Sequence, residues 1–215
     1  MDARIHRSTN TVGVMQKNIL LSQLCDAAHY FHQKGWMLGT AGNLSARTED
    51  TNFWITSSGQ NKGELTPEQF LLLSPQGDIL HHPAPSLRPS AETSIHIAVY
   101  DLFPDARACL HVHMLESNWV CDHHPQPWME LPPLEMLKGF GWTGGPAHIL
   151  VTDNHDHVPQ IADDLRAAHH DREGFWIPGF LIRNHGITAW GRDISEARNR
   201  IELFSYIFSY MCRAS

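Results

Sequence analysis

The chain has 215 residues, of which 42% are hydrophobic and 18% are charged, and its formal net charge is -7. This composition predicts a globular protein with a sizeable core and excludes a disordered chain. The negative charge argues against a nucleic-acid-binding protein, which usually presents a basic face.

The sequence carries no sign of export or of membrane insertion. Its first 18 residues lack the apolar core of a signal peptide, and no apolar run is long enough to cross a bilayer. The four cysteines are scattered and form no C-x-x-C pair, which is typical of reduced thiols. We therefore expect one domain over residues 1–215, located in the cytoplasm, with no nucleic-acid or membrane partner.

In the first half, apolar residues recur at helical spacing over residues 14–32, and Gly35 is a plausible end of that helix. The Gly- and Ser-punctuated segments that follow predict short strands joined by turns, with a brief helical turn at residues 66–68. Ser90 follows Pro89 and is expected to be the N-cap of a helix that ends before Pro104.

In the second half, helix and strand patterns continue to alternate. This interleaving favours a layered α/β domain, and some connections are too short for a crossover helix, so part of the sheet should be antiparallel. The expected strands are residues 106–114, 148–152, 180–183 and 187–190, and the expected helices are residues 116–121, 159–170 and 195–212.

The segment ACLHVHM, residues 108–114, places two histidines in an apolar strand. Side chains alternate along a strand, so His111 and His113 share one face with Cys109, about 7 Å apart along the chain. Two imidazoles at that spacing can bind one zinc ion, and burying both needs a stronger reason than core packing. The pair His155 and His157 lies among acids and turn formers, which makes it a poor metal site.

A catalytic zinc site needs a third ligand and an open position. His185 lies in LIRNHGITAW, where a strand stops and resumes, and Gly186 permits close approach of the backbone. His96, four residues after Glu92 on one helix, is a rival ligand, although the two residues can also be an ordinary i, i+4 pair.

Three short segments have the chemistry of an anion pocket: Gly42-Asn43, Ser57-Ser58-Gly59 and Ser90. Backbone N–H groups, hydroxyls and a helix N-terminus all favour negative charge. Two carboxylates are candidates for acid–base roles. Glu92 follows Ser90 at the helix start, and Glu135 lies in the locally apolar LEMLKGFGW, unless it is a solvated residue paired with Lys138.

The ordered set GTAGNLS, TSSG, PSAET, LHVH and NHG resembles the zinc-dependent class II aldolase family, from about Leu20 to Met211. The resemblance implies a three-layer α/β/α fold around a largely antiparallel central sheet. It also implies a homotetramer with sites at subunit boundaries, and one Zn²⁺ per subunit on three histidines. These carry over onto His111, His113 and His185, and the phosphate pocket onto Gly42, Asn43, Ser58, Gly59 and Ser90.

The segment PPLEMLKGFG resembles the branch of this family that dehydrates 5-methylthioribulose 1-phosphate, and it places an acid–base role on Glu135. Glu92 takes the position of the aldolase glutamate, with Ala91 in place of a serine. We expect a dehydratase acting on a small sugar phosphate. A sugar-phosphate aldolase or a pentulose-phosphate epimerase is the alternative, because one enediolate chemistry serves all three. A non-catalytic zinc-stabilised binding module is a third interpretation.

Overall fold

The structure is a computed structural model that describes residues 3–171 and 175–214. One nine-stranded sheet crosses it in the order β4-β3-β2-β1-β5-β9-β8-β7-β6. All neighbouring strands are antiparallel except β7 and β8, which are parallel. The strands are β1 (Asn43–Arg47), β2 (Phe53–Thr56), β3 (Phe70–Leu73), β4 (Ile79–His81), β5 (Ala108–Val112), β6 (Trp128–Leu131), β7 (Ala147–Thr152), β8 (Gly179–Ile182) and β9 (Gly186–Gly191).

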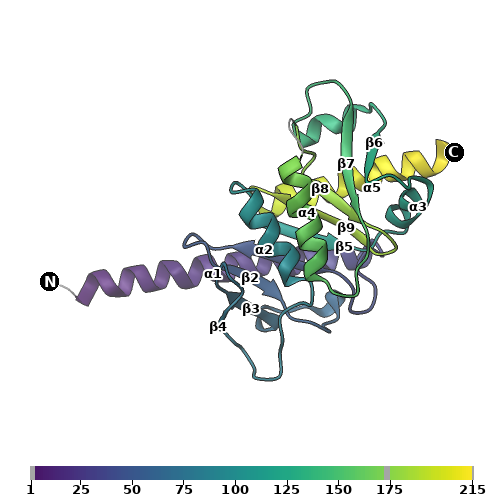
Figure 1. The fold of residues 1–215 in the computed structure, drawn as a ribbon. Coiled ribbons are helices and arrows are strands. Elements are labelled where there is room, and N and C mark those ends of the chain that lie inside the picture. Colours follow the sequence, from purple (N-terminus) through teal and green to yellow (C-terminus); the bar gives the residue numbers. More distant parts are fainter. Residues whose placement is uncertain (1–2, 172–174, 215) are drawn as a thin grey trace.

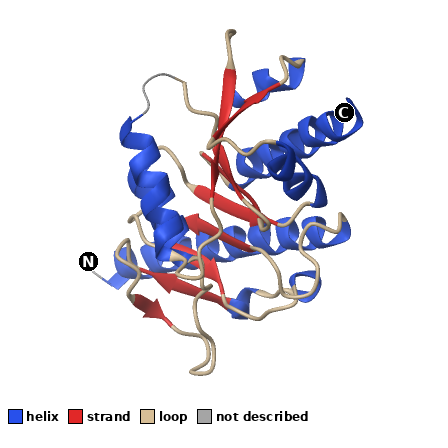
Figure 2. Ribbon diagram, turned by 45° about the vertical axis from the view of Figure 1, so that its right-hand side comes forward, coloured by secondary structure: helices blue, strands red, loops and turns tan. Residues whose placement is uncertain are grey.

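Helices cover both faces of the sheet (Figure 1, Figure 2). One hydrophobic cluster joins one face of the sheet to α1, α3 and α5, and a second cluster joins the opposite face to α2 and α4. The expected three-layer α/β/α fold is therefore confirmed. The helices are α1 (Ala3–Gln33), α2 (Thr93–Leu102), α3 (Leu115–His123), α4 (Pro159–Asp171) and α5 (Ile194–Ala214), with 3-10 turns η1 (Lys62–Glu64), η2 (Pro67–Gln69) and η3 (Glu135–Phe140).

The alternation of side chains along β5 sets the position of the histidines. Leu110 and Val112 belong to the cluster under α1 and α5, whereas Cys109 belongs to the cluster under α2 and α4. His111 shares the parity of Cys109, so its side chain lies on the face that α2 covers. Among the described residues, no helix has both the length and the apolar character needed to span a bilayer.

One expectation differs from the structure, and one strand was not expected. Ser90 is not an N-cap: Glu92 has that position, because residues 90–93 form a turn in which the Ser90 carbonyl accepts from Thr93 N, and α2 begins at Thr93. The proline-rich stretch after α3 contains β6, an edge strand that pairs with β7. The prolines on either side of β6 argue against a strand in the sequence, because proline cannot donate a hydrogen bond to a neighbouring strand. An edge strand tolerates them.

Candidate metal centre

Three distant segments bring four potential ligands together. His111 lies on β5, His113 lies just beyond its end, and His185 lies in the turn between β8 and β9. Glu92, the N-cap of α2, approaches from the helical layer above this face. The ligand atoms of these four residues all lie within 4.8 Å of one another.

The imidazole rings face one another closely. The ring centroids are 4.9 Å apart for His111 and His113, 4.8 Å for His111 and His185, and 4.6 Å for His113 and His185. A carboxylate oxygen of Glu92 lies 3.3 Å from His111 Nε2, and the other lies 3.4 Å from His185 Nε2. The expected convergence of the three histidines is thus present in the fold.

The polar atoms of this cluster fit a metal ion. His111 Nε2, His113 Nε2 and His185 Nδ1 are buried and have no hydrogen-bond partner, and neither has Glu92 Oε2. Burial lowers the pKa of His111 to about 3 and that of His113 to about 4, so both imidazoles are neutral near pH 7. Ligand atoms gathered within 4.8 Å of one another, two of them on neutral imidazoles, suit a divalent transition metal, and leaving buried polar atoms without a partner is costly.

A hydrogen bond outside the cluster orients His111. Its Nδ1 lies 2.9 Å from Thr188 Oγ1, on the neighbouring strand β9. With Nδ1 protonated and donating to the hydroxyl, Nε2 carries the lone pair that faces the cluster. Thr188 was not predicted from the sequence, because it is separated from His111 by 77 positions.

Two glycines allow the strands to approach. A Cβ at Gly186 would lie 2.2 Å from the Val112 carbonyl oxygen, so only glycine fits where the turn with His185 meets β5. Gly42 has a φ of +75°, and a Cβ there would lie 2.8 Å from the His111 carbonyl oxygen. The close approach expected at Gly186 is confirmed.

Glu92 is held as a carboxylate. Burial alone would raise its pKa, but the imidazoles of His111 and His185, and a hydrogen bond from Asn43, lower the pKa well below its usual range. The rival ligand His96 does not join the cluster: its Nε2 lies 2.5 Å from Asn43 Oδ1 and its Nδ1 lies 2.6 Å from Ser45 Oγ.

The three segments of the expected anion pocket meet near Glu92. Ser57 forms an isolated bridge with Pro89, and Ser58 N donates to the Arg88 carbonyl over 2.9 Å, so that Ser58-Gly59 lies beside the segment of Ser90. Asn43 joins them through its contact with Glu92. The Ser58 N–H is thus already engaged, whereas Gly59, with a φ of +75°, is exposed.

Glu135 lies outside the cluster. It begins η3, its side chain is 81% exposed, and its carboxylate pairs with Lys138 Nζ at 2.8 Å. The expectation that apolar surroundings would enclose this carboxylate is wrong for the chain on its own. Its neighbours in the sequence, Leu137 and Phe140, turn into the core and leave Glu135 outside.

A buried cation, Lys62, was also not predicted from the sequence. Lys62 is 1% exposed, and its ammonium donates to the carbonyls of Thr40 and Gln60, each over 2.9 Å. Burial lowers the pKa of Lys62 to about 8, against the opposing attraction of Glu92. A lysine within a polar loop gives no sequence signal for burial.

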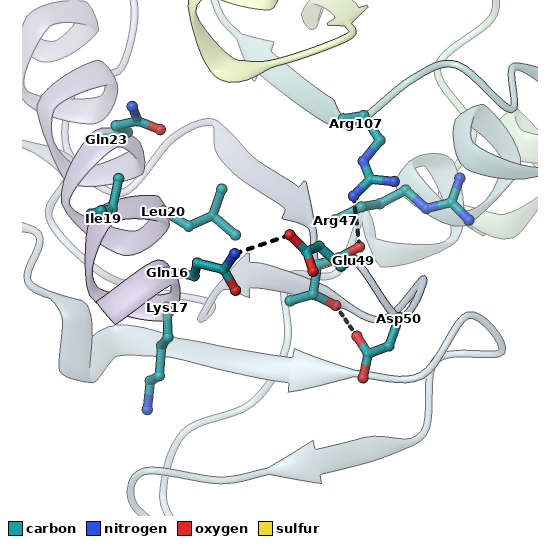
Figure 3. Close-up of a pocket in the computed structure, with 10 residues that line it drawn as sticks. Gln16, Lys17, Ile19, Leu20, Gln23, Arg47, Glu49, Asp50 and Arg107 are labelled. Atoms are coloured by element: carbon teal, nitrogen blue, oxygen red, sulfur yellow. Dashed lines mark hydrogen bonds between the residues drawn. The ribbon is translucent and has the colours of Figure 1, made fainter. Parts of the chain in front are cut away.

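A cavity of about 540 Å³ forms a groove between α1 and the β1–β2 turn, and none of the candidate residues line it. Figure 3 shows Gln16 of α1 reaching Glu49 across this groove, with Arg47 and Arg107 on the far side. The candidate centre is defined by its ligand atoms and not by cavity size.

The fold and the cluster together define an α/β/α protein with a candidate metal centre beside a helix N-terminus. Comparison with known proteins identifies its family. Residues 22–212 match the family model described as Class II Aldolase and Adducin N-terminal domain. The chain belongs to this family.

Close relatives share one name. The chain is 45% identical over 193 residues to a methylthioribulose-1-phosphate dehydratase from Microcystis aeruginosa, covering 89% of this chain and 94% of the relative. It is 39% identical over 200 residues to the enzyme of that name from Enterobacter sp. (strain 638), covering 90% and 94%.

Solved structures share the fold. YgbL from Escherichia coli, described as a putative aldolase/epimerase/decarboxylase, matches with a TM-score of 0.77 and 23% identity, over 93% of this chain and 91% of that one. An L-fuculose 1-phosphate aldolase matches with a TM-score of 0.74 and 21% identity, over 91% and 85%.

Proposed function

We propose that this chain is a zinc-dependent hydro-lyase that converts 5-methylthioribulose 1-phosphate into 2,3-diketo-5-methylthiopentyl 1-phosphate, a step of methionine salvage. The observation that carries the proposal is the cluster of three imidazoles with unpartnered, buried nitrogens beside Glu92. The name shared by relatives that cover about nine tenths of the chain supports the substrate.

His111, His113 and His185 would hold one zinc ion per subunit. Zinc, when bound with an open position, supplies a Lewis acid that polarises a substrate carbonyl. Thr188 fixes the ring of His111 for this purpose. Glu92, already anionic and directed at the same point, would contact the substrate oxygens or the metal.

The phosphate of the substrate would bind at Gly42, Asn43, Ser58, Gly59 and Ser90. Their meeting beside Glu92 supports this assignment. The Asn43 amide and Ser58 N–H have partners within the chain, so Gly59 N–H and the Ser58 and Ser90 hydroxyls are the donors left for an anion. Anchoring the phosphate would orient the carbonyl end of the sugar at the histidines.

Glu135 would donate the proton that the leaving hydroxyl needs. A carboxylate that is 81% exposed in one chain needs enclosure before it can do this, and a homotetramer with sites at subunit boundaries would provide it. We further propose that residues 1–215 form one domain and that the enzyme works in the cytoplasm.

Replacing Glu135 with glutamine tests its role. General acid catalysis contributes about 10²–10⁴-fold, so E135Q should lose activity on methylthioribulose phosphate by that factor while its zinc content stays at one per chain. E130Q, another exposed carboxylate on the neighbouring β6, is the matched control and should keep full activity. Near wild-type dehydration by zinc-loaded E135Q would reject the assignment.

The alternatives make different predictions. An aldolase or epimerase would turn over fuculose, rhamnulose or pentulose phosphates and not methylthioribulose phosphate, so assaying these substrates side by side separates them. A zinc-stabilised binding module would close the site with four protein ligands and unfold on chelation. A metal site with three protein ligands and an exchangeable water would exclude the module.

A further inference from the structure

A row of buried polar side chains leads from the core to the metal centre. Tyr100 OH lies 2.7 Å from Ser45 Oγ, Ser45 Oγ lies 2.6 Å from His96 Nδ1, and His96 Nε2 lies 2.5 Å from Asn43 Oδ1. Asn43 in turn makes a side-chain hydrogen bond with Glu92. Tyr100 is 6% exposed and the other three residues of the row are at most 2% exposed.

The chemistry of the groups at its ends determines which atom donates each hydrogen bond in this row. The Glu92 carboxylate accepts only, so Asn43 must present its NH₂ group to Glu92 and its Oδ1 to His96. His96 Nε2 must therefore carry the proton, and Nδ1 of the neutral ring accepts from the Ser45 hydroxyl. The Ser45 oxygen then accepts from Tyr100.

The environment agrees with this assignment. Burial lowers the pKa of His96 to about 4, which leaves the ring neutral with one donor and one acceptor. Burial raises the pKa of Tyr100 well above its ordinary value, so its hydroxyl keeps its proton and remains a donor. At the far end, the Arg47 guanidinium lies 5.2 Å from the Tyr100 ring centre and lines the groove of Figure 3.

We propose that His96 is a positioning residue for the metal centre: its Nε2–H fixes the Asn43 amide, and Asn43 thereby holds the Glu92 carboxylate toward the three histidines. Ser45 stabilises this tautomer of His96, because its hydroxyl donates to Nδ1. Without its hydroxyl, the ring could place the proton on Nδ1 and present a lone pair to Asn43 Oδ1. Asn43 would then have to rotate and turn its oxygen toward Glu92. The inference rests on the proposed metal centre but not on the substrate.

The first test is the tautomer of His96 in the full chain. Long-range ¹H–¹⁵N NMR distinguishes the two tautomers, and the His96 signals are those that vanish in H96Q. We expect a neutral ring with the proton on Nε2, in both metal-free and zinc-loaded protein, and a shift of the proton toward Nδ1 in S45A. A ring protonated on Nδ1 in the wild-type protein would overturn the proposal.

The second test measures zinc affinity by competition with a chelator. H96L removes both hydrogen bonds, and the loss of a hydrogen bond that orients a metal site weakens metal binding about 10–100-fold. H96Q supplies an NH₂ group for Asn43 and an oxygen for Ser45, so it should stay close to wild type. Y100F leaves the Ser45 hydroxyl free to donate and should also stay close.

Each outcome has a definite meaning. If H96L binds zinc with wild-type affinity, or if H96Q binds zinc as weakly as H96L, then His96 only fills space and the proposal is overturned. If H96L does not fold, S45A carries the test, since it should weaken zinc binding while Y100F does not. A chain that binds no zinc overturns this inference and the proposed centre together. Zinc binding without dehydration of methylthioribulose phosphate overturns the proposed substrate alone.

Discussion

Replacing Gly186 with alanine tests the packing that brings His185 to His111. The new Cβ would lie 2.2 Å from the Val112 carbonyl oxygen and 3.2 Å from His111 Cε1, whereas ordinary contact begins at 3.4 Å. The overlap therefore exceeds 1 Å, and the obstacle is backbone. β5 cannot yield alone, because it is paired with β1 on one side and β9 on the other. The start of β9 must move away from β5, and His185 must move with it.

Overpacking of this kind costs about 1–3 kcal/mol or more, and in a chain of this size each kcal/mol lowers the melting temperature by about 2–4 °C. We expect metal-free G186A to melt roughly 2–12 °C below wild type in calorimetry, and its zinc content to fall well below one per chain. G139A is the control: its Cβ would lie 2.5 Å from Leu203 Cδ1, the mobile end of a side chain. If G186A matches G139A in stability and binds a full zinc ion, the packing argument is wrong.

Three further predictions follow from single contacts. T188V removes the acceptor of His111 Nδ1 and should weaken zinc binding about 10–100-fold in a chelator competition; an unchanged affinity would contradict the role of Thr188. Burial lowers the pKa of His96 to about 4 and of His111 to about 3, so below pH 6.5 the unfolded chain binds more protons and the metal-free protein loses stability as the pH falls. At pH 5 each of these two histidines should lower the free energy of unfolding, measured with urea, by about 2 kcal/mol relative to pH 7. An unfolding free energy that does not change between pH 7 and pH 5 would refute this. Arg183 donates to four main-chain carbonyls, from Cys121 in α3 to Gln126 before β6, so R183A should lose about 2 kcal/mol of unfolding free energy. R183K should recover only part of this loss, and equal stability of all three proteins would count against the prediction.

Most of the fold could be predicted from the sequence because each helix buries one face and the central strands are buried on both. In α5 the buried residues recur at helical spacing, and in β5 a short apolar run indicates a buried strand. The start of α2 could not be predicted in this way. Ser90 is a suitable capping residue, but its segment is tied to Ser57 through Pro89 by a bridge that links two distant parts of the chain. Local capping preference is worth about 1 kcal/mol, and such a tertiary contact overrides it.

The residues of the site also differ in how far the sequence predicts them. His111 and His113 are recognisable because two imidazoles in an apolar strand need a shared reason for burial. His185 could be predicted only because Asn184 and Gly186, on either side of it, are typical turn residues. Asn184 has a φ of 52°. Thr188 and the role of His96 depend on pairings more than 50 positions apart, and no local pattern encodes them.

The charges around the candidate metal centre are compatible with the proposed anionic substrate, although the chain is acidic. Burial keeps the imidazoles of His111 and His113 neutral near pH 7. The carboxylate of Glu92 attracts the ammonium of Lys62, which is still protonated near pH 7 because its pKa is lowered only to about 8. These two charges cancel. A divalent ion at the histidines would therefore leave the centre with a local excess of positive charge, although the chain carries a net charge of -7. The metal would then serve two needs at once, since the same ion that activates the carbonyl end of the substrate also offsets the charge of its phosphate.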